Sequence, residues 1–242
     1  MHNLVIDIGN SSLKAAFTDG SELKDIHKIE GGPDILSSVS PLLKNKEINT
    51  IAISCVRDIE QHFFEELKKK CDKLIVVDGN TPLPIINEYK TPGTLGPDRL
   101  VAAYAATKIF PDKNCMIFDF GTAVTIDFVT SDGKFSGGNI SPGLRSRFRS
   151  LNDYTQRLPL VDIPENLIEK GGETKEAIQS GVILGLIFEI EGYIRAYPDY
   201  TAIFTGGDAN YFAEKTKNPI FAICNLVLIG LAHIANSYVK RK

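Results

Sequence analysis

The sequence predicts an α/β fold built from two related domains, and two observations lead to this prediction. Short apolar runs that are typical of buried strands alternate with segments whose apolar residues recur at helical spacing. In addition, residues 4–9 and residues 116–121 each form an apolar run that ends in Asp-x-Gly, and a second strand-like run follows each. A repeated strand–turn–strand unit indicates a duplicated domain, here residues 1–112 and residues 113–242. The alternative to duplication is that so short a pattern occurs twice by chance.

Each predicted element rests on a local pattern. Residues 4–8 are an apolar run that ends at a turn, residues 13–17 form its hairpin partner, and residues 59–70 combine helical spacing with lysines at the end. The further predicted strands are residues 50–56, 73–77, 116–121 and 201–205, and the further predicted helices are residues 98–110, 174–197 and 225–239, the last one amphipathic. Residues 146–172 are polar and give few signals.

Composition argues against several classes of protein. The chain of 242 residues is 43% hydrophobic and 24% charged, with a net charge of −3, which is ordinary for a globular protein. Nucleic-acid-binding domains usually carry a basic face, so we predict no nucleic-acid partner. No apolar run approaches the roughly 18 residues that a membrane span needs, and no signal peptide is visible. The four cysteines also form no CxxC pair. These three observations together lead us to predict a cytoplasmic protein with no membrane partner.

The first candidate site is the turn Asp7-Ile8-Gly9-Asn10-Ser11-Ser12-Leu13-Lys14, which joins the first two predicted strands. Small residues let backbone N–H groups approach an anion closely, and the hydroxyl, amide and ammonium groups of the turn add further donors. Asp7 is a candidate ligand of Mg²⁺, which prefers oxygen atoms and keeps part of its water shell. The alternative is a β-hairpin whose Gly-Asn turn is purely conformational.

Two later turns have a similar composition. Asp119-Phe120-Gly121-Thr122-Ala123 again presents a carboxylate, a glycine and a hydroxyl, and two such turns facing each other would hold a triphosphate from both sides. Thr205-Gly206-Gly207-Asp208 follows an apolar run, and its paired glycines would let the backbone pack flat against an adenosine. The alternative for the first of these turns is a purely conformational hairpin. The alternative for the second is a simple strand-to-helix turn capped by Asp208.

The stretch Tyr89-Lys90-Thr91-Pro92-Gly93-Thr94-Leu95-Gly96-Pro97-Asp98-Arg99 is the most specific in the chain. Gly and Pro mark a loop that leads directly into a predicted helix. Asp98, at the start of that helix, can accept a proton from an alcohol or orient it, and Arg99 can pair with an anionic group. The alternative is that Asp98 only caps or charges the first helical turn.

Taken in order, the three turns resemble those of the superfamily of acetate and sugar kinases, actin and the heat-shock chaperone ATPases. Members of that superfamily have two ribonuclease-H-like domains with ATP in the cleft between them, so the resemblance implies a duplicated, actin-like ATPase fold. A longer series resembles the type III pantothenate kinases and covers residues 7 to about 208. It consists of Asp7-Ile8-Gly9-Asn10-Ser11, Tyr89-x-x-Pro92-x-x-x-Gly96-x-Asp98-Arg99, Asp119-x-Gly121-Thr122-Ala123, Gly137-Gly138-Asn139-Ile140-Ser141-Pro142-Gly143 and Thr174-x-x-Ala177-Ile178-x-x-Gly181. The family often has threonine where this chain has Ser11, which keeps the hydroxyl.

This resemblance implies an enzyme that phosphorylates pantothenate with ATP to give 4'-phosphopantothenate, the first step of coenzyme A biosynthesis. It implies a homodimer, Mg²⁺, and a monovalent cation, K⁺ or NH₄⁺, bound by Asp119. It implies that Asp98 accepts the proton of the pantothenate hydroxyl and that Thr174 contacts pantothenate across the dimer interface. The implied ATP-binding residues are Asp7, Ile8, Gly9, Asn10, Ser11, Ser12, Leu13, Lys14 and Thr122. The implied pantothenate-binding residues are Tyr89, Gly96, Pro97, Asp98, Arg99 and Thr174.

Three other functions stay open on the sequence. Another small-molecule kinase of the superfamily would phosphorylate a sugar or an acetate-like acid and would not respond to pantothenate. A non-catalytic regulatory protein would bind ATP and release no ADP with any candidate alcohol. An actin-like assembly module would form filaments, although so short a chain leaves little sequence for the necessary insertions.

Overall fold

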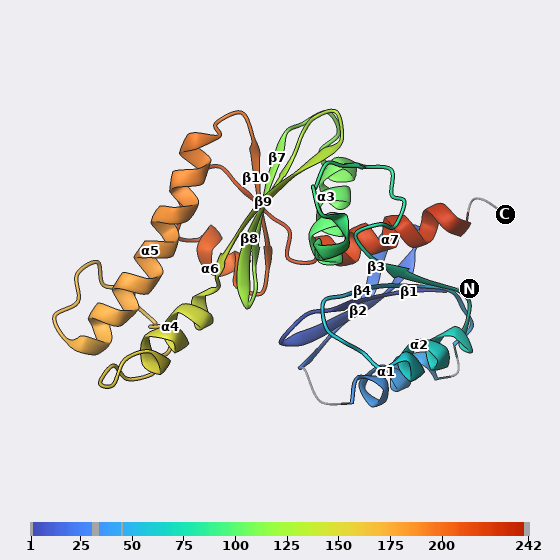
Figure 1. The fold of residues 1–242 in the computed structure, drawn as a ribbon, viewed down its shortest axis with the longest axis horizontal. Helices are drawn as coiled ribbons and strands as arrows, with labels where there is room; N and C mark the ends of the chain where they lie inside the picture. The colour runs from blue at the N-terminus through green and yellow to red at the C-terminus, as the bar shows by residue number, and fades with distance from the viewer. Residues whose placement is uncertain (1, 31–33, 45, 240–242) are drawn as a thin grey trace. The chain divides into compact units, whose positions relative to one another are not determined.

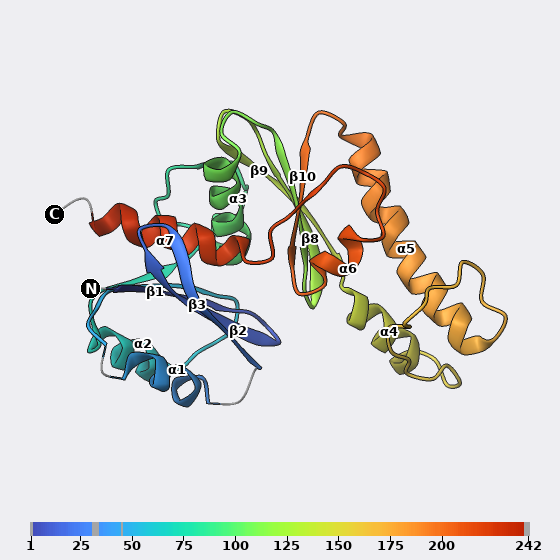
Figure 2. The ribbon, with the colours of Figure 1, turned by 180° about the vertical axis from the view of Figure 1, so that it is seen from behind.

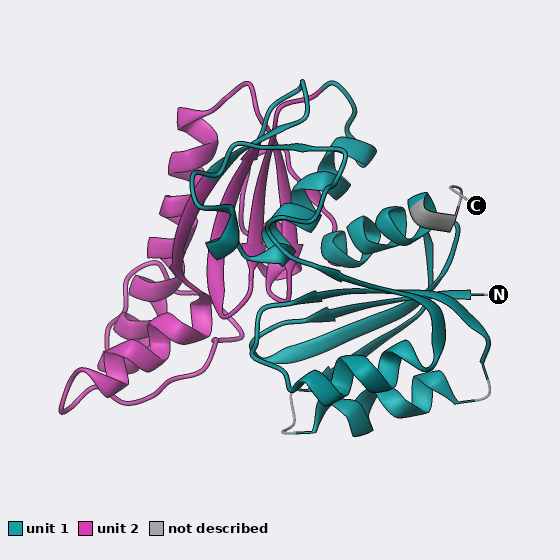
Figure 3. Cartoon of the chain, turned by 45° about the vertical axis from the view of Figure 1, so that its right-hand side comes forward, with its two compact units in different colours: residues 1–112, 129–137, 225–242 teal, residues 113–128, 138–224 magenta. Residues whose placement is uncertain are grey.

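The computed structural model describes residues 2–30, 34–44 and 46–239 (Figure 1), and the chain divides into two compact units (Figure 3). The first unit comprises residues 1–112, 129–137 and 225–242, and the second comprises residues 113–128 and 138–224. Each unit has its own hydrophobic core.

The first unit is built on a five-stranded sheet in the order β3-β2-β1-β4-β5. Its strands are β1 (His2–Ile8), β2 (Ser12–Asp19), β3 (Glu22–Glu30), β4 (Ile48–Cys55) and β5 (Cys71–Val77). β1, β2 and β3 pair antiparallel, whereas β4 pairs parallel with both β1 and β5. The carboxyl ends of β1, β4 and β5 therefore lie at one edge, which is where open α/β sheets bind ligands.

Helices cover both faces of this sheet. They are α1 (Ile35–Leu43), α2 (Gln61–Lys68), α3 (Pro97–Ile109) and α7 (Leu226–Val239). Buried residues of α1 and α2 join the core formed by alternate residues of β1, β2 and β4. Figures 1 and 2 show α7 on the opposite face of the sheet, where it contacts β1 and β4. The helix α3 packs against the other side of α7. Gly230 allows this close packing, because a Cβ there would lie 2.4 Å from the carbonyl oxygen of Val101.

The second sheet has six strands in the order β11-β10-β7-β8-β9-β6. They are β6 (Ile86–Asn87), β7 (Cys115–Phe120), β8 (Ala123–Val129), β9 (Lys134–Pro142), β10 (Thr201–Gly206) and β11 (Phe221–Ala222). The remaining helices are a 3₁₀ turn (Pro92–Thr94), α4 (Leu144–Asp153), α5 (Thr174–Ala196) and α6 (Ala209–Ala213). The core of the second unit joins β7, β8 and β10 to α4, α5 and α6.

The helix α5 is the one element of the described chain that is long and apolar enough to cross a membrane, judged by length and composition. Its residues Ile183, Leu186 and Ile190 are fully buried or nearly so and belong to the core of the second unit. We therefore interpret α5 as a core helix.

The structure confirms the predicted strands and helices and adds elements that the sequence analysis did not predict. The polar stretch at residues 146–172 begins inside α4, of which only Leu144 and Phe148 are buried. β3 is an edge strand with mostly exposed side chains, and α1 contains Pro41, so neither has a clear periodic signal. The closing helix α7, predicted as amphipathic, is buried on most sides because it lies between the sheet and α3.

The compact units group residues differently from the predicted domains. Residues 225–242 were assigned to a C-terminal domain with residues 113–224, whereas α7 packs on the sheet of the first unit. The predicted division between residues 112 and 113 describes the duplication of a domain. A division into compact units does not test duplication, so this division stays a prediction.

Candidate active site

The first candidate turn connects β1 to β2 at the carboxyl edge of the first sheet. It is closed by a backbone hydrogen bond from the N–H of Gly9 to the carbonyl oxygen of Ser12, at 3.0 Å. The side chains of Asn10 and Ser11 are exposed. A Cβ on Gly9 would lie 3.2 Å from the same Ser12 oxygen and would have no other described atom within 4 Å outside residues 8–10. The turn is thus a tight hairpin of small residues with an exposed tip, a form that lets an anion approach the backbone.

Polar side chains flank this turn on one face of the sheet. Asp7 is opposite Lys14 on β2 and opposite Ser54 on β4, and side chains of paired residues point to the same side. The Nζ atom of Lys14 donates a hydrogen bond to the Oδ1 atom of Asn225, at 3.3 Å, just before α7. The fold therefore brings a carboxylate, an ammonium group and a hydroxyl together beside the turn.

Asp98 stands in the first turn of α3, after Pro97. Its Oδ1 atom accepts a hydrogen bond from the backbone N–H of Arg99, at 2.9 Å. Gly96 leaves room for this carboxylate, since a Cβ on Gly96 would lie 2.5 Å from Oδ1 of Asp98. The sequence Gly-Pro-Asp-Arg thus positions one carboxylate at the positive end of a helix.

Burial raises the pKa of Asp98 above the ordinary value for an aspartate, while the backbone hydrogen bond and the charge of Arg99 act in the opposite direction. A carboxylate with a raised pKa is a better proton acceptor than an ordinary aspartate, because its conjugate acid is weaker. A perturbed pKa in a ligand-binding region is a feature of catalytic groups.

Arg99, Tyr89 and Phe135 form a cluster next to Asp98. Arg99 is only 6% exposed, and its Cζ atom lies 5.7 Å from the ring centre of Tyr89 and 6.0 Å from that of Phe135. The two rings are 6.2 Å apart. The N–H of Tyr89 donates to Oδ1 of Asn87, at 3.0 Å. This arrangement buries the cation against aromatic faces, which stabilises it.

The second candidate turn connects β7 to β8 and has neighbours on several sides. The N–H of Gly121 donates to the carbonyl oxygen of Ala123, at 3.0 Å. The carbonyl oxygen of Thr122 accepts from the N–H of Gly143, at 3.0 Å, and from Oγ of Ser146, at 2.6 Å. A Cβ on Gly143 would lie 2.1 Å from the carbonyl oxygen of Gly121. The end of β9 and the start of α4 therefore support this turn.

The third candidate turn lies directly beside the second. β10 pairs parallel with β7, which places Thr205 opposite Asp119. Gly206 has φ +92°, and a Cβ there would lie 2.4 Å from Oδ1 of Asp119, so glycine is required at this contact. Asp208 is held by Arg145, whose Nη1 atom donates to both carboxylate oxygens at 2.9 and 3.1 Å.

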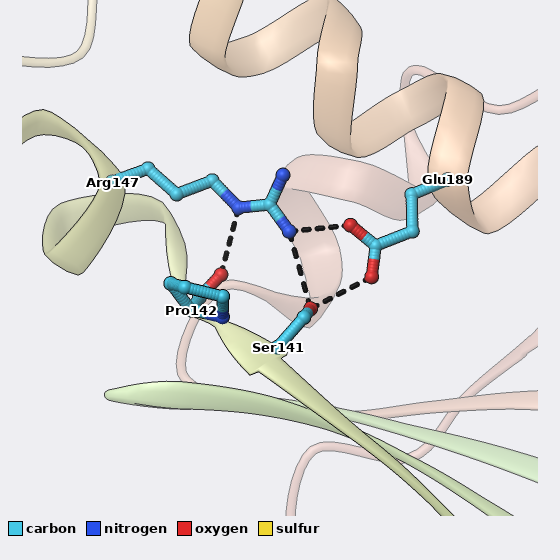
Figure 4. A network of polar contacts seen from close by, with 4 residues as sticks. All are labelled: Ser141, Pro142, Arg147 and Glu189. Atoms are coloured by element: carbon cyan, nitrogen blue, oxygen red, sulfur yellow. Dashed lines mark hydrogen bonds and ion pairs between the residues drawn. The ribbon is translucent and has the colours of Figure 1, made fainter.

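A polar network fixes the end of β9 to α5 (Figure 4). The Nη2 atom of Arg147 bonds to Oε2 of Glu189 and, at 3.1 Å, to Oγ of Ser141, while its Nε atom donates to the carbonyl oxygen of Pro142 at 2.7 Å. Oγ of Ser141 donates to Oε1 of Glu189 at 2.7 Å. Because Gly143 follows Pro142, the network anchors the segment that supports the second turn.

Thr174 is the first residue of α5 and is exposed. The N–H of Gly172 just before it donates to Oε2 of Glu176 at 2.8 Å, which caps the start of the helix. No contact in the described chain assigns a ligand to Thr174.

The predicted site residues thus fall into two groups. The first unit holds the turn at residues 7–14, Tyr89 and the segment at residues 96–99, and the second unit holds Asp119, Thr122 and Thr174. The sequence analysis did not single out Phe135, Arg145, Arg147 or Glu189, since a lone charge or aromatic residue carries no motif. Gly143 and Gly206 belong to the motifs described above. Their close contacts with neighbouring segments could not be predicted, because these contacts depend on the folded structure.

Two carboxylates of the candidate turns could hold hard cations. Among the residues described, no group of three or more His, Cys, Asp or Glu side chains could hold a metal ion. Mg²⁺ does not need such a group, because kinases hold it through one or two carboxylates and the substrate phosphates. Asp7, half-buried at the carboxyl end of β1, supplies one such carboxylate. Asp119, close to the backbone of Phe120 and Gly206, offers an oxygen ligand to a hard cation.

Solved structures show the fold. The activator of the 2-hydroxyisocaproyl-CoA dehydratase from Clostridium difficile with bound ADPNP aligns over 100% of this chain and 96% of its own, with a TM-score of 0.62 and 12% identity. The ROK hexokinase from Thermus thermophilus aligns over 100% of both chains, with a TM-score of 0.53 and 13% identity. The predicted two-domain, actin-like ATPase fold is therefore confirmed.

Sequence comparison gives the family. The family model described as type III pantothenate kinase matches residues 3–196. The chain is 40% identical over 236 residues to the type III pantothenate kinase of Phocaeicola vulgatus, covering 96% of this chain and 97% of that one. It is 39% identical over 238 residues to that of Bacteroides fragilis, covering 97% of each. The resemblance found in the motifs is confirmed, and the chain belongs to the type III pantothenate kinase family.

Proposed function

We propose that this chain phosphorylates pantothenate with ATP in the cytoplasm, the first step of coenzyme A biosynthesis. Relatives that carry this activity in their names, at 39% and 40% identity over nearly the whole chain, support the proposal. The pantothenate hydroxyl oxygen forms a bond to the γ-phosphorus of ATP, and the bond from that phosphorus to the β,γ-bridging oxygen breaks. ADP and 4'-phosphopantothenate result, and the hydroxyl proton passes to Asp98.

The observation that carries the proposal is the environment of Asp98. It is a partly buried carboxylate at the start of a helix, with a raised pKa, and it has the buried Arg99 as its neighbour. Such a group can orient an alcohol and accept its proton. Phosphoryl transfer otherwise depends on positioning and on stabilising charge, so one well-placed carboxylate meets the chemical need.

The two glycine turns would hold the nucleotide. The turn from Asp7 to Lys14 has an exposed tip at Asn10 and Ser11 and a lysine that donates to Asn225. Thr122 stands in a turn to which Ser146 donates a hydrogen bond. Mg²⁺ bound through Asp7 would neutralise charge on the phosphates, and a monovalent cation, K⁺ or NH₄⁺, would bind at Asp119.

Pantothenate would bind at the Tyr89–Arg99 cluster. The acid carries a carboxylate, and the buried guanidinium of Arg99 is a suitable partner for an anion. Tyr89 is held by its backbone bond to Asn87 and by the Phe135 ring, so it would form one wall of the site. Gly96 and Pro97 would complete that wall because they fix the start of α3.

A homodimer would use the exposed face of α5. Gly181, Gly185 and Gly192 follow one face of this helix, and a Cβ on any of them would meet nothing within 4 Å in the described chain. Phe188, on the same face, is 64% exposed. An exposed apolar face of this kind indicates a protein interface, and identical copies usually assemble symmetrically. Thr174, at the start of α5, would then contact pantothenate bound to the other copy.

Substitution of Asp98 by asparagine tests the mechanism. We expect a loss of turnover of about 10²–10⁴-fold with little change in ATP affinity, measured by pantothenate-dependent ADP release and by calorimetry. Loss of ATP binding in this variant would contradict the assigned role. Hexoses and acetate serve as alternative acceptors, and a preference for one of them over pantothenate would point to another kinase of the superfamily.

The pH dependence gives a second readout. The base must be ionised, so wild-type turnover falls as the pH drops through the raised pKa of Asp98, and this decline begins at a higher pH than an ordinary aspartate would give. A raised pKa in the folded state also means that stability is lost as the pH rises through it. The asparagine variant should therefore melt no lower than the wild type near pH 8, and a clearly lower melting temperature would contradict this account.

A further inference from the structure

An arginine at the carboxyl edge of the first sheet has no role in the mechanism above. Arg57 follows β4 by two residues, and the N–H of the intervening Val56 donates to the carbonyl oxygen of Ile8, at 3.1 Å. The Nε and Nη2 atoms of Arg57 are buried and have no hydrogen-bond partner among the residues that the structure describes. The same holds for Oγ of Ser54, which is fully buried.

Strand pairing places these groups beside the first glycine turn. Asp7 pairs with Ser54, and Ile8 pairs with Cys55, so β4 ends level with the turn that leaves β1. Burial is the main cause of the raised pKa of Cys55, and the charges of Arg57 and Asp7 act on this thiol in opposite directions. Both charged residues therefore lie near the end of the same strand.

Two buried guanidinium nitrogen atoms without a hydrogen-bond partner are costly, because they have lost their water and gained no hydrogen bond. In native proteins such groups are explained by an ordered water or ion or by a catalytic role, and a bound ligand can supply the missing acceptor. Of the two cations at this edge, Lys14 already donates to Asn225, whereas Arg57 has unused donors. The fork of an arginine matches the oxygens of a phosphate or a carboxylate, and the position of Arg57 beside the first glycine turn favours the phosphate.

We propose that Arg57 binds the γ-phosphoryl group of ATP and is a further catalytic residue of this enzyme. The proposal rests on the kinase function. The guanidinium would stabilise the negative charge on the γ-phosphoryl oxygens while the bond to the bridging oxygen breaks, in the manner known for arginines in phosphoryl transfer.

The kinetic test compares Arg57→Gln and Arg57→Lys with Arg149→Gln, which changes an exposed arginine on α4. We expect Arg57→Gln to lower kcat by about 10²–10³-fold, Arg57→Lys to recover part of that loss, and Arg149→Gln to match the wild type. Calorimetry should show ADP affinity changed by less than about threefold and affinity for a non-hydrolysable ATP analogue reduced by more.

A stability measurement distinguishes this role from a structural one. Arg57→Gln removes a charged group with two buried nitrogen atoms that have no hydrogen-bond partner among the described residues. The melting temperature of the nucleotide-free variant should therefore equal or exceed that of the wild type. The upward shift in melting temperature that the ATP analogue produces should become smaller. An arginine that only supports the fold would give the opposite result, a lower melting temperature without nucleotide.

Three outcomes would overturn the proposal. These are an unchanged kcat in Arg57→Gln, an equal loss of ADP and ATP-analogue affinity, and a change confined to the KM for pantothenate, which would assign the anion to the pantothenate carboxylate. Failure of the kinase function itself has a different signature, because the wild-type enzyme would then release no ADP in response to pantothenate.

Discussion

The two Asp-x-Gly turns have the same composition but differ in how the fold supports them. The turn after β1 is closed by one backbone bond at Gly9, and its Asn10 and Ser11 side chains are exposed. The turn after β7 is in contact with Gly143 and Ser146, and the carboxylate of Asp119 lies against Gly206.

The difference shows that the same short motif can be fixed to different degrees. A Cβ on Gly9 would meet a single described atom within 4 Å outside its chain neighbours, whereas one on Gly143 would meet at least three backbone atoms within 3 Å. The second turn is already held in place by residues from β9, β10 and α4, so it needs little ordering on binding. We infer that its neighbours preorganise the second turn and that steric crowding around its backbone distinguishes it from the first turn.

The largest expected effect comes from adding a methyl group to Gly143. Its Cβ would lie 2.1 Å from the carbonyl oxygen of Gly121 and 2.7 Å from that of Thr122, and backbone atoms cannot move aside easily. We expect Gly143→Ala to lower the free energy of unfolding by about 1–3 kcal/mol. Displacement of the turn should also lower kcat/KM for ATP by about 10²-fold.

Gly9→Ala is the matched comparison. Its Cβ would approach only one oxygen, at 3.2 Å, so we expect a loss of stability below about 1 kcal/mol. Any loss of activity in this variant would then reflect the approach of the ligand to the turn. Urea unfolding and steady-state kinetics measure both quantities. Equal stability of Gly143→Ala and the wild type would refute the contrast between the two turns.

The network of Arg147 and Glu189 should have an intermediate effect (Figure 4). Both side chains are largely buried, with exposures of 21% and 24%, and they hold the residues just before Gly143. Hydrogen bonds to charged groups contribute about 1.5–3 kcal/mol each, so we expect Glu189→Gln to lower the free energy of unfolding by about 2 kcal/mol. A double-mutant cycle with Arg147→Ala would measure the coupling of the pair.

The exposed pair of Glu66 and Lys69 is the control for that experiment. Its side chains are 30% and 66% exposed, and such surface pairs contribute less than about 1 kcal/mol. Glu66→Gln should therefore change stability little and leave the KM for ATP unchanged. If Glu189→Gln also left stability unchanged, the second turn would not depend on α5.

The sequence predicted the sheet strands and the turns well, because both depend on short-range patterns. The apolar runs of β1 and β7 and the small residues that follow them are visible in any window of ten residues. β3 was not predicted, since an edge strand exposes most of its side chains and gives no clear alternation. α4 was not predicted, because only two of its residues are buried.

The support of the candidate site could not be predicted from the sequence. A glycine such as Gly143 shows its contact with Gly121 only once the chain has folded. A charged residue such as Arg57 normally indicates an exposed position, so its buried nitrogen atoms are known only from the structure. The same holds for Glu189, which lies in an apolar helix and has partners more than forty positions away.

The smallest expected effect concerns the hydroxyl of Ser146. Its Oγ atom donates to the carbonyl oxygen of Thr122 at 2.6 Å, and the same oxygen accepts from the N–H of Gly143 at 3.0 Å. A hydrogen bond of this kind contributes about 1 kcal/mol, which corresponds to an increase of about fivefold in the KM for ATP if the turn loosens. Ser150→Ala is the control, because the Ser150 hydroxyl donates only within α4, to the carbonyl oxygen of Arg147 at 2.9 Å. Steady-state kinetics on both variants should show the change for Ser146→Ala alone, and equal effects would mean that the contact to the turn contributes nothing beyond helix stability.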